Sequence, residues 1–141
     1  MSRIFLDTML FIYWLEGHRQ YGSRVEEILV RTVERDDQLC TSSLAAGETL
    51  VGLHKRGAID TVREVQDFFR HGPIEVIPYT LQVADLYARI RAMHAVSSAD
   101  GIHLACAASM GTDLFLTNDN RLVGKSVPGI QFIAGLDTNI I

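Results

Sequence analysis

The apolar residues of this chain alternate between short continuous runs and longer stretches with helical spacing, and this alternation constrains the fold more than any other feature. Five short runs predict buried strands, at residues 4–6, 38–41, 74–77, 114–116 and 130–133. Six longer stretches predict amphipathic helices, at residues 8–16, 21–35, 43–55, 59–69, 81–94 and 99–110. Strands that alternate with helices are typical of parallel βαβ units, in which helices cover both faces of one sheet. We therefore predict a doubly wound α/β domain in three layers.

The length and the cysteine content fit one globular domain without disulfides. We assign residues 1–141 to a single domain, because a chain of 141 residues can bury a core of its own. The two cysteines, Cys40 and Cys106, lie in separate apolar runs without metal-binding or redox spacing. This pattern indicates buried, reduced thiols.

No segment has the pattern of an export signal or a membrane span. Residues 4–15 are mostly apolar, but Asp7 interrupts them and no small-residue cleavage site follows. No stretch approaches the roughly 20 apolar residues of a membrane helix, so we expect a cytoplasmic protein without a membrane partner. The net charge of −4 does not by itself indicate a nucleic-acid partner, because domains that bind nucleic acids are usually basic.

Two aspartates follow predicted strands at the edge of the sheet where ligands bind. Asp7 comes directly after residues 4–6, and Asp119 lies three residues beyond Leu116. In open parallel sheets, ligands occupy the crevice beyond the carboxyl ends of the strands. Asp7 could instead cap the helix that follows it, and Asp119 could belong to an ordinary turn. For each residue alone, both interpretations stay open.

Two further acids lie on predicted helices. Glu48 shares a helix face with Leu44 and Val51, where a carboxylate is costly unless a basic residue or a ligand pairs with it. Asp100 lies in the first turn of a helix of small residues, where the helix dipole favours an anion even without a ligand. His103 lies one turn later on the same face, and we interpret it as a packed or surface residue rather than as an acid–base catalyst.

The four acids stand within short motifs that together resemble one protein family. The motifs are Ile4-Phe5-Leu6-Asp7-Thr8, Glu48 after Thr41-Ser42-Ser43-Leu44, Ala99-Asp100-Gly101-Ile102-His103-Leu104-Ala105, and Leu116-Thr117-Asn118-Asp119. Their order, spacing and flanking residues resemble the PIN domain from about Arg3 to Leu136. At this length the chain is similar to the single-domain VapC-type toxins, which are the ribonuclease half of a toxin–antitoxin pair.

This resemblance implies a three-layer α/β/α fold with a central five-stranded parallel sheet, a homodimer, and a cognate antitoxin protein as partner. It also implies metal-dependent cleavage of RNA. The positions that match the family's catalytic and metal-binding acids are Asp7, Glu48, Asp100 and Asp119, and those that match its supporting polar residues are Thr117 and Asn118. The chain departs from the family pattern at Ala46-Gly47 before Glu48, and at Gly101, where Ala is commoner.

A divalent cation suits such a set of acids. Mg²⁺ prefers oxygen ligands in octahedral geometry and usually keeps several waters, and Mn²⁺ accepts the same ligands. Without a cation the clustered carboxylates repel one another, so at least one of them should have a raised pKa. We expect a water activated by the metal to attack the scissile phosphate, with Asp7 and Asp100 as the direct ligands. Glu48 and Asp119 could hold a second ion, hold a water or assist removal of a proton.

Local basic residues near the acids are the candidates for binding RNA. They are Lys55 and Arg56 at a predicted helix end, and Arg121 and Lys125 shortly after Asp119. Each of them could also be an ordinary solvated surface charge.

Other α/β domains that handle phosphate fit the sequence less well. A receiver domain needs paired acids after the first strand, and a haloacid-dehalogenase-like phosphatase needs Asp-x-Asp where this chain has Asp7-Thr8-Met9. Nucleotide-binding folds need a glycine-rich loop after the first strand, and none is present. The alternative that stays open is a PIN-fold binding module without significant cleavage activity.

Overall fold

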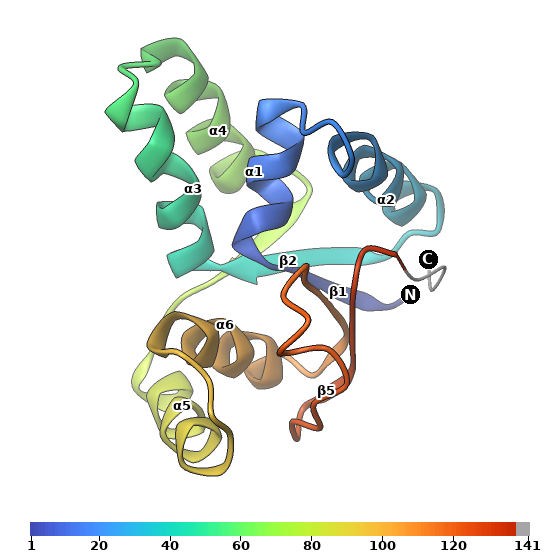
Figure 1. Cartoon of the computed structure of the whole chain (residues 1–141), viewed down its shortest axis with the longest axis vertical. Coiled ribbons are helices and arrows are strands. Elements are labelled where there is room, and N and C mark those ends of the chain that lie inside the picture. The colour runs from blue at the N-terminus through green and yellow to red at the C-terminus, as the bar shows by residue number, and fades with distance from the viewer. Residues whose placement is uncertain (138–141) are drawn as a thin grey trace.

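The computed structural model describes residues 1–137, and these form one five-stranded sheet with helices on both faces (Figure 1). The strands are β1 (Arg3–Leu6), β2 (Gln38–Ser42), β3 (Ile74–Ile77), β4 (Thr112–Leu116) and β5 (Ile130–Ala134). They lie in the order β3-β2-β1-β4-β5, and every neighbouring pair is parallel. The predicted α/β fold with five parallel strands is confirmed, whereas the predicted single domain includes residues 138–141, which lie outside the described part of the chain.

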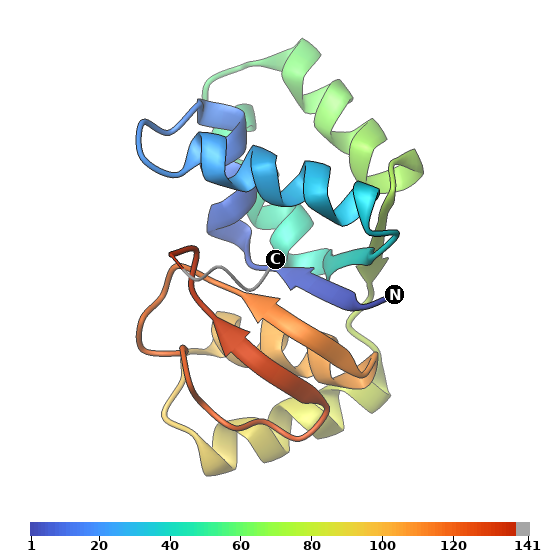
Figure 2. The ribbon, with the colours of Figure 1, turned by 90° about the vertical axis from the view of Figure 1, so that its right-hand side faces the viewer.

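Four helices cover one face of the sheet and two cover the other (Figures 1 and 2). The first face carries α1 (Thr8–Glu16), α2 (Gly22–Glu34), α3 (Ser43–Lys55) and α4 (Ile59–His71). The second carries α5 (Leu81–Met93) and α6 (Ser98–Ser109). The three layers predicted from the alternating pattern are therefore present.

Residues of β1 point alternately to the two faces, so this strand contributes to a separate core on each side. Phe5 stacks on Phe115 with ring centroids 4.8 Å apart, in the core beneath α5 and α6. Ile4 and Leu6 belong to the core beneath α1 and α2. Trp14, half-buried, packs against that second core and contacts Phe68 edge-on at 5.6 Å.

The strand order changes direction at β1. The chain runs from β1 outward to β2 and β3, then returns to place β4 on the opposite side of β1. At such a switch point the connections leave in opposite directions, which opens a crevice at the carboxyl ends of the two central strands. Asp7 follows β1 and Thr117 follows β4, so both lie at the mouth of this crevice.

Serine caps set the starts of two of the helices that border the crevice. Ser42 Oγ accepts a hydrogen bond from the Ala45 N–H at 2.9 Å and caps α3. Ser97 Oγ accepts from the Asp100 N–H at 3.1 Å and caps α6. Each cap satisfies an N–H group that has no partner within its own helix.

The two cysteines are free and buried, as predicted. Burial raises the pKa of the Cys40 thiol to about 12 and that of Cys106 to about 11. Among the described residues, no helix is both long enough and apolar enough to cross a bilayer.

Candidate active site

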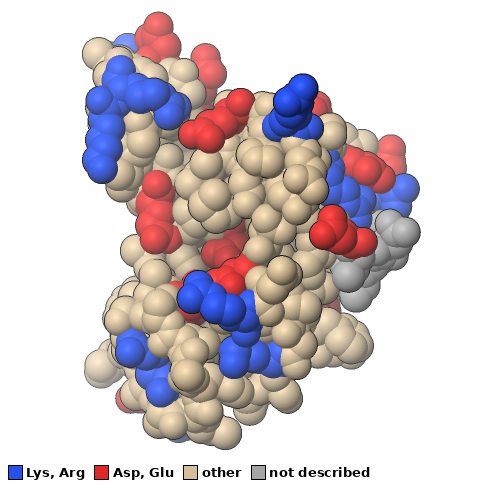
Figure 3. Space-filling model, in the orientation of Figure 1, with Lys and Arg blue, Asp and Glu red and all other residues tan. Residues whose placement is uncertain are grey.

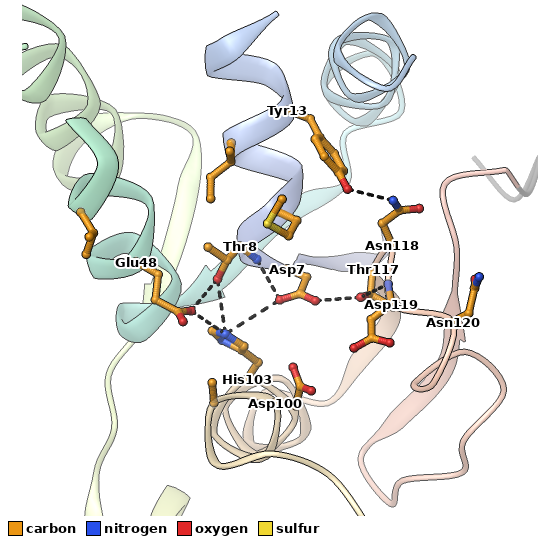
Figure 4. A pocket seen from close by; sticks show the side chains of 14 residues that line it. Asp7, Thr8, Tyr13, Glu48, Asp100, His103, Thr117, Asn118, Asp119 and Asn120 are labelled. Carbon is orange, nitrogen blue, oxygen red and sulfur yellow. Dashed lines mark hydrogen bonds and ion pairs between the residues drawn. The ribbon is translucent and has the colours of Figure 1, made fainter. Parts of the chain in front are cut away.

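A pocket of about 620 Å³ lies at the crevice, and it is lined by all four acids predicted from the sequence (Figure 4). Asp7 lies at the start of α1, Glu48 on α3, Asp100 on α6 and Asp119 in the loop after β4. Figure 4 shows their side chains directed toward one common space, with His103 beside Glu48. Four separate segments of the chain therefore bring carboxylates to one place.

Asp7 both caps a helix and lines the pocket, so the two interpretations of this residue are compatible. Its side chain accepts hydrogen bonds from the Thr8 N–H at 2.8 Å and from the Thr117 hydroxyl at 2.7 Å. Only 8% of the residue is exposed. Burial raises the pKa of Asp7, and it outweighs the opposing effects of nearby His103 and of these hydrogen bonds. An acid with a raised pKa was expected from repulsion between the carboxylates; the pKa of Asp7 is raised, but mainly by burial, and the nearby Asp100 charge contributes least.

Glu48 is held by two donors that come from different elements. The Thr8 hydroxyl donates to Glu48 Oε1 at 2.7 Å, and His103 Nε2 lies 2.9 Å from the same oxygen. The carboxylate therefore has partners on α1 and α6 although it belongs to α3. The polar partners of Glu48 are His103 and Thr8, not a Lys or an Arg.

Asp100 projects from the first turn of α6, where helix α5 approaches closely. A Cβ atom at the next position, Gly101, would lie 3.0 Å from both Arg91 Cδ and Tyr87 Cε2. The Arg91 guanidinium is held in place, because Nη1 donates to the Tyr87 hydroxyl at 2.9 Å and to Ser98 Oγ at 2.7 Å. The glycine that departs from the family pattern thus leaves room for these two side chains against the turn that carries Asp100.

Asp119 forms a two-pronged ion pair with Arg121. Arg121 Nε lies 3.0 Å from Oδ1 and Nη2 lies 2.8 Å from Oδ2. The Arg121 guanidinium, mainly through these hydrogen bonds, holds the pKa of Asp119 below its usual value. One of the residues predicted to bind RNA is therefore paired with one of the predicted acids.

The two polar residues before Asp119 have different partners. Thr117 Oγ1 donates to Asp7 and accepts from the Asp119 N–H at 3.1 Å, so it ties the ends of β1 and β4 together. Asn118 Nδ2 donates to the Tyr13 hydroxyl at 2.9 Å and fixes the loop against α1. Thr117 thus orients an acid directly, and Asn118 orients the loop.

Basic side chains border this face, and acidic ones lie at the bottom of its central hollow (Figure 3). Arg56 lies 3.6 Å from Glu16 across the groove between α1 and α3. Lys55 and Arg121 are exposed, and Lys125 is partly buried. None of the four basic residues predicted to bind RNA lines the pocket itself, and Arg56 and Arg121 are each paired with an acid.

The donor set suits a hard divalent cation that keeps part of its water. Within residues 1–137, no group of three or more His, Cys, Asp or Glu side chains is arranged so that it could hold a metal ion. The Asp7, Glu48 and Asp119 carboxylates are each engaged with neighbours, whereas no described side chain makes a hydrogen bond or ion pair with the Asp100 carboxylate. Mg²⁺ usually binds through one or two carboxylates and several waters, so these residues fit it.

His103 and Thr8 are the pocket residues that sequence reasoning missed. Both line the pocket and both are buried, with 3% of His103 exposed. The available signal was the position of His103 one turn after Asp100, which places both side chains on the pocket side of α6.

Comparisons with known proteins point to one family and one fold. The sequence matches the family model described as PIN domain over residues 4–126. No curated protein matches the chain. Three solved structures illustrate the likeness of fold.

The first is VapBC2 from Rickettsia felis bound to a DNA fragment from their promoter, with a TM-score of 0.74, 16% identity, and coverage of 94% of this chain and 98% of that chain. The second is DNA-bound VapBC from Salmonella typhimurium, with a TM-score of 0.73, 24% identity, and coverage of 96% and 99%. A toxin–antitoxin complex from Klebsiella pneumoniae has a TM-score of 0.66, 19% identity, and coverage of 90% and 94%.

Proposed function

Because the chain belongs to the PIN-domain family, we propose that it is a metal-dependent ribonuclease that hydrolyses RNA phosphodiester bonds. The observation that carries the proposal is the convergence of Asp7, Glu48, Asp100 and Asp119, from four segments, on one pocket at the switch point of the sheet. Close carboxylates repel one another, and a bound cation offsets that repulsion. The same cation would make the pocket attractive to a phosphate.

The four acids fall into two pairs in this proposal. Asp7 and Asp100 would hold Mg²⁺ or Mn²⁺, and the hydroxyl of Thr117, which donates to Asp7 Oδ2, fixes the orientation of that carboxylate. The bound ion would lower the pKa of a water and stabilise charge on the phosphoryl oxygens. Glu48 and Asp119 face the same space and orient water or accept its proton. Lys55, Arg56, Arg121 and Lys125 contact the RNA backbone around the pocket.

We further propose that the chain is the toxin of a VapBC-type pair and works as a homodimer inhibited by a cognate antitoxin protein. This proposal is supported by the fold and by length. The chain spans 98% and 99% of the matched chains in the Rickettsia felis and Salmonella typhimurium complexes, so a single PIN unit accounts for nearly all of each.

The test is cleavage of a mixed RNA pool by the wild type, by Asp7→Asn and by Asp85→Asn, each with Mg²⁺, with Mn²⁺ and with a chelator. Asp85 is exposed on α5 and does not line the pocket, so its substitution is a matched loss of one charge. We expect cutting by the wild type and by Asp85→Asn that depends on the metal. Asp7→Asn should fold normally and lose activity by at least about 100-fold, as for a metal site deprived of a ligand.

Three outcomes contradict the proposal in different ways. If Asp7→Asn cuts RNA as fast as the wild type does, the assignment of the catalytic site is wrong. If cutting persists in the presence of the chelator, the proposed dependence on a metal ion is wrong. RNA binding without any cutting by the wild type would instead support a binding module that keeps the fold.

A further inference from the structure

His103 lies at the centre of the polar network of the pocket. Its ring is buried between β2, α1 and α3, and both ring nitrogens have polar partners. Nδ1 lies 2.7 Å from Ser42 Oγ, and Nε2 lies 2.9 Å from Glu48 Oε1 and 3.3 Å from Thr8 Oγ1. Asp7 Oδ1 is 3.8 Å from the same Nε2. One side chain on α6 therefore faces residues from three other elements.

The partners determine the direction of the hydrogen bond to Glu48. A carboxylate oxygen can only accept, so Nε2 must carry a proton and donate it to Oε1. In the neutral ring Nδ1 then accepts from the Ser42 hydroxyl, whose oxygen accepts in turn from the Ala45 N–H. The result is a continuous chain of donors from the first turn of α3, through His103, to Glu48 on the same helix.

This chain of hydrogen bonds acts on one oxygen of Glu48 and not on the other. The Thr8 hydroxyl and His103 Nε2 both reach Oε1, whereas no hydrogen bond from a described residue reaches Oε2. Two donors on one oxygen fix the rotation of the carboxylate about its terminal bond. Oε2 is then available, in a defined direction, to whatever occupies the pocket.

We infer that His103 is a positioning residue, which holds Glu48 Oε1 so that Oε2 serves the divalent cation or its water; this inference rests on the proposed function. A packing role alone does not account for the residue. His103 lies next to Phe5, with ring centroids 6.4 Å apart, in a wall where an apolar side chain would pack without the cost of burying two polar nitrogens. Partners that hold a ligand in place typically change metal affinity or activity by 10–100-fold when they are removed.

The first measurement needs neither RNA nor metal. The ¹⁵N chemical shifts of the His103 ring distinguish a protonated from an unprotonated nitrogen in the wild-type protein. We expect Nε2 to be protonated and to show coupling to the Glu48 carboxylate, which disappears in Glu48→Gln. An unprotonated Nε2 would overturn the inference, because Glu48 Oε1 would then have no donor on the ring.

The second measurement compares Mn²⁺ affinity, by electron paramagnetic resonance on RNA-free protein, in the wild type, His103→Leu, His103→Gln and His94→Leu. His94 is a matched control, because it ends α5 away from the pocket lining and its buried Nε2 has no hydrogen-bond partner among the described residues. We expect His103→Leu to weaken Mn²⁺ binding by about 10–100-fold. His103→Gln, whose amide can still donate to Glu48, should recover much of this loss, and His94→Leu should bind as the wild type does.

Kinetics separate positioning from RNA binding and from the proposed function. In His103→Leu we expect kcat to fall by about 10–100-fold while KM for RNA stays unchanged, because no RNA contact is removed. If His103→Leu has the kcat and the Mn²⁺ affinity of the wild type, and cutting still depends on metal, the inference about His103 is wrong while the proposed function stands. If the wild-type protein neither binds Mn²⁺ nor cuts RNA, the proposed function is wrong, and the role of His103 toward a metal is wrong as well. The ¹⁵N shifts of the ring still show in that case whether His103 donates to Glu48. If His103→Leu does not fold, the inference is tested by the Mn²⁺ affinity of His103→Gln and by the ¹⁵N shifts of the wild-type ring.

Discussion

Asp7 shows, at the scale of single residues, how a functional group can oppose stability. Its carboxylate is buried, and burial raises its pKa more than Thr117, Thr8 and His103 together lower it. The folded protein therefore binds a proton at Asp7 more tightly than the unfolded chain does. Below the ordinary pKa of an aspartate, Asp7 is protonated in both the folded and the unfolded state, and its ionisation costs no stability. As the pH rises through the raised pKa that Asp7 has in the folded protein, the free energy of unfolding falls. At neutral pH and without metal, the Asp7 charge costs free energy of folding.

Asp7→Asn should therefore stabilise the metal-free protein at neutral pH while it removes activity. Asn keeps the acceptor for the Thr8 N–H but cannot ionise. We expect Tm in the presence of a chelator to rise by a few degrees, since about 1 kcal/mol moves Tm by about 4 °C in a domain of this size. Calorimetry between acidic and neutral pH should show the difference from the wild type vanishing on the acidic side. A lower Tm for Asp7→Asn at neutral pH would contradict this account of the pocket.

The Asp119–Arg121 pair gives a second prediction at this scale. Because the hydrogen bonds of Arg121 lower the pKa of Asp119, Arg121→Gln should raise that pKa toward its ordinary value. Lys125→Gln removes the same charge from the same loop without touching the pair, and it should leave the pKa of Asp119 nearer the wild-type value. A carbon-13 titration of the Asp119 carboxyl measures both. Equal pKa values in the two variants would mean that the pair is absent in solution.

The identity of the acids could be predicted from the sequence, but their partners could not. Asp7 and Asp119 follow strands, so their place in a parallel sheet follows from the apolar runs. The contact of His103 with Glu48 depends on how α6 and α3 are rotated relative to each other, which apolar spacing does not define. Thr117 was expected to support an acid, and it does so by donating its hydroxyl to Asp7, which follows the neighbouring strand β1.

At the scale of helices and strands, most ends could be predicted because residues near them in the sequence, such as caps and glycines, determine where the element begins or stops. Helix α1 and strand β3 have the predicted bounds. Helix α4 continues to His71, two residues beyond the prediction, and stops at Gly72, where a Cβ would lie 2.4 Å from the Phe68 carbonyl oxygen. Strand β4 begins two residues early, because Thr112 pairs with Ile130 across the sheet. Such pairing depends on strand order, and the alternating pattern left that order open.

A glycine at the entrance to β5 offers a prediction about how α6 is seated. Gly129 has φ +94°, and a Cβ there would lie 2.6 Å from the Ala108 carbonyl oxygen on α6; Gly124 has φ +82° but open space around it. Gly124→Ala should cost about 1–2 kcal/mol, from backbone strain alone. Gly129→Ala should cost about 1–3 kcal/mol more, because α6 or β5 must also move. Urea unfolding of both variants measures the difference, and equal costs would show that Gly129 is not packed against α6.

At the scale of the whole molecule, the two thiols report on global unfolding. Cys40 on β2 and Cys106 on α6 are both fully buried in the core beneath α5 and α6, with pKa values raised to about 12 and about 11. The thiolate is the reactive form, so neither residue should react with a disulfide reagent at neutral pH while the protein is folded. We expect labelling of both to accelerate with urea in parallel with the loss of circular dichroism. Rapid labelling of the native protein would show that the core beneath α5 and α6 opens locally.

The central position of β1 means that the two halves of the crevice are synthesised at different times. Asp7 precedes its partner, the Thr117 hydroxyl beyond the neighbouring strand β4, by 110 residues. A ribosome therefore makes β2, β3 and the intervening helices before the residues that complete the pocket. In the proposed ribonuclease, the pocket can form only after β4 has been made.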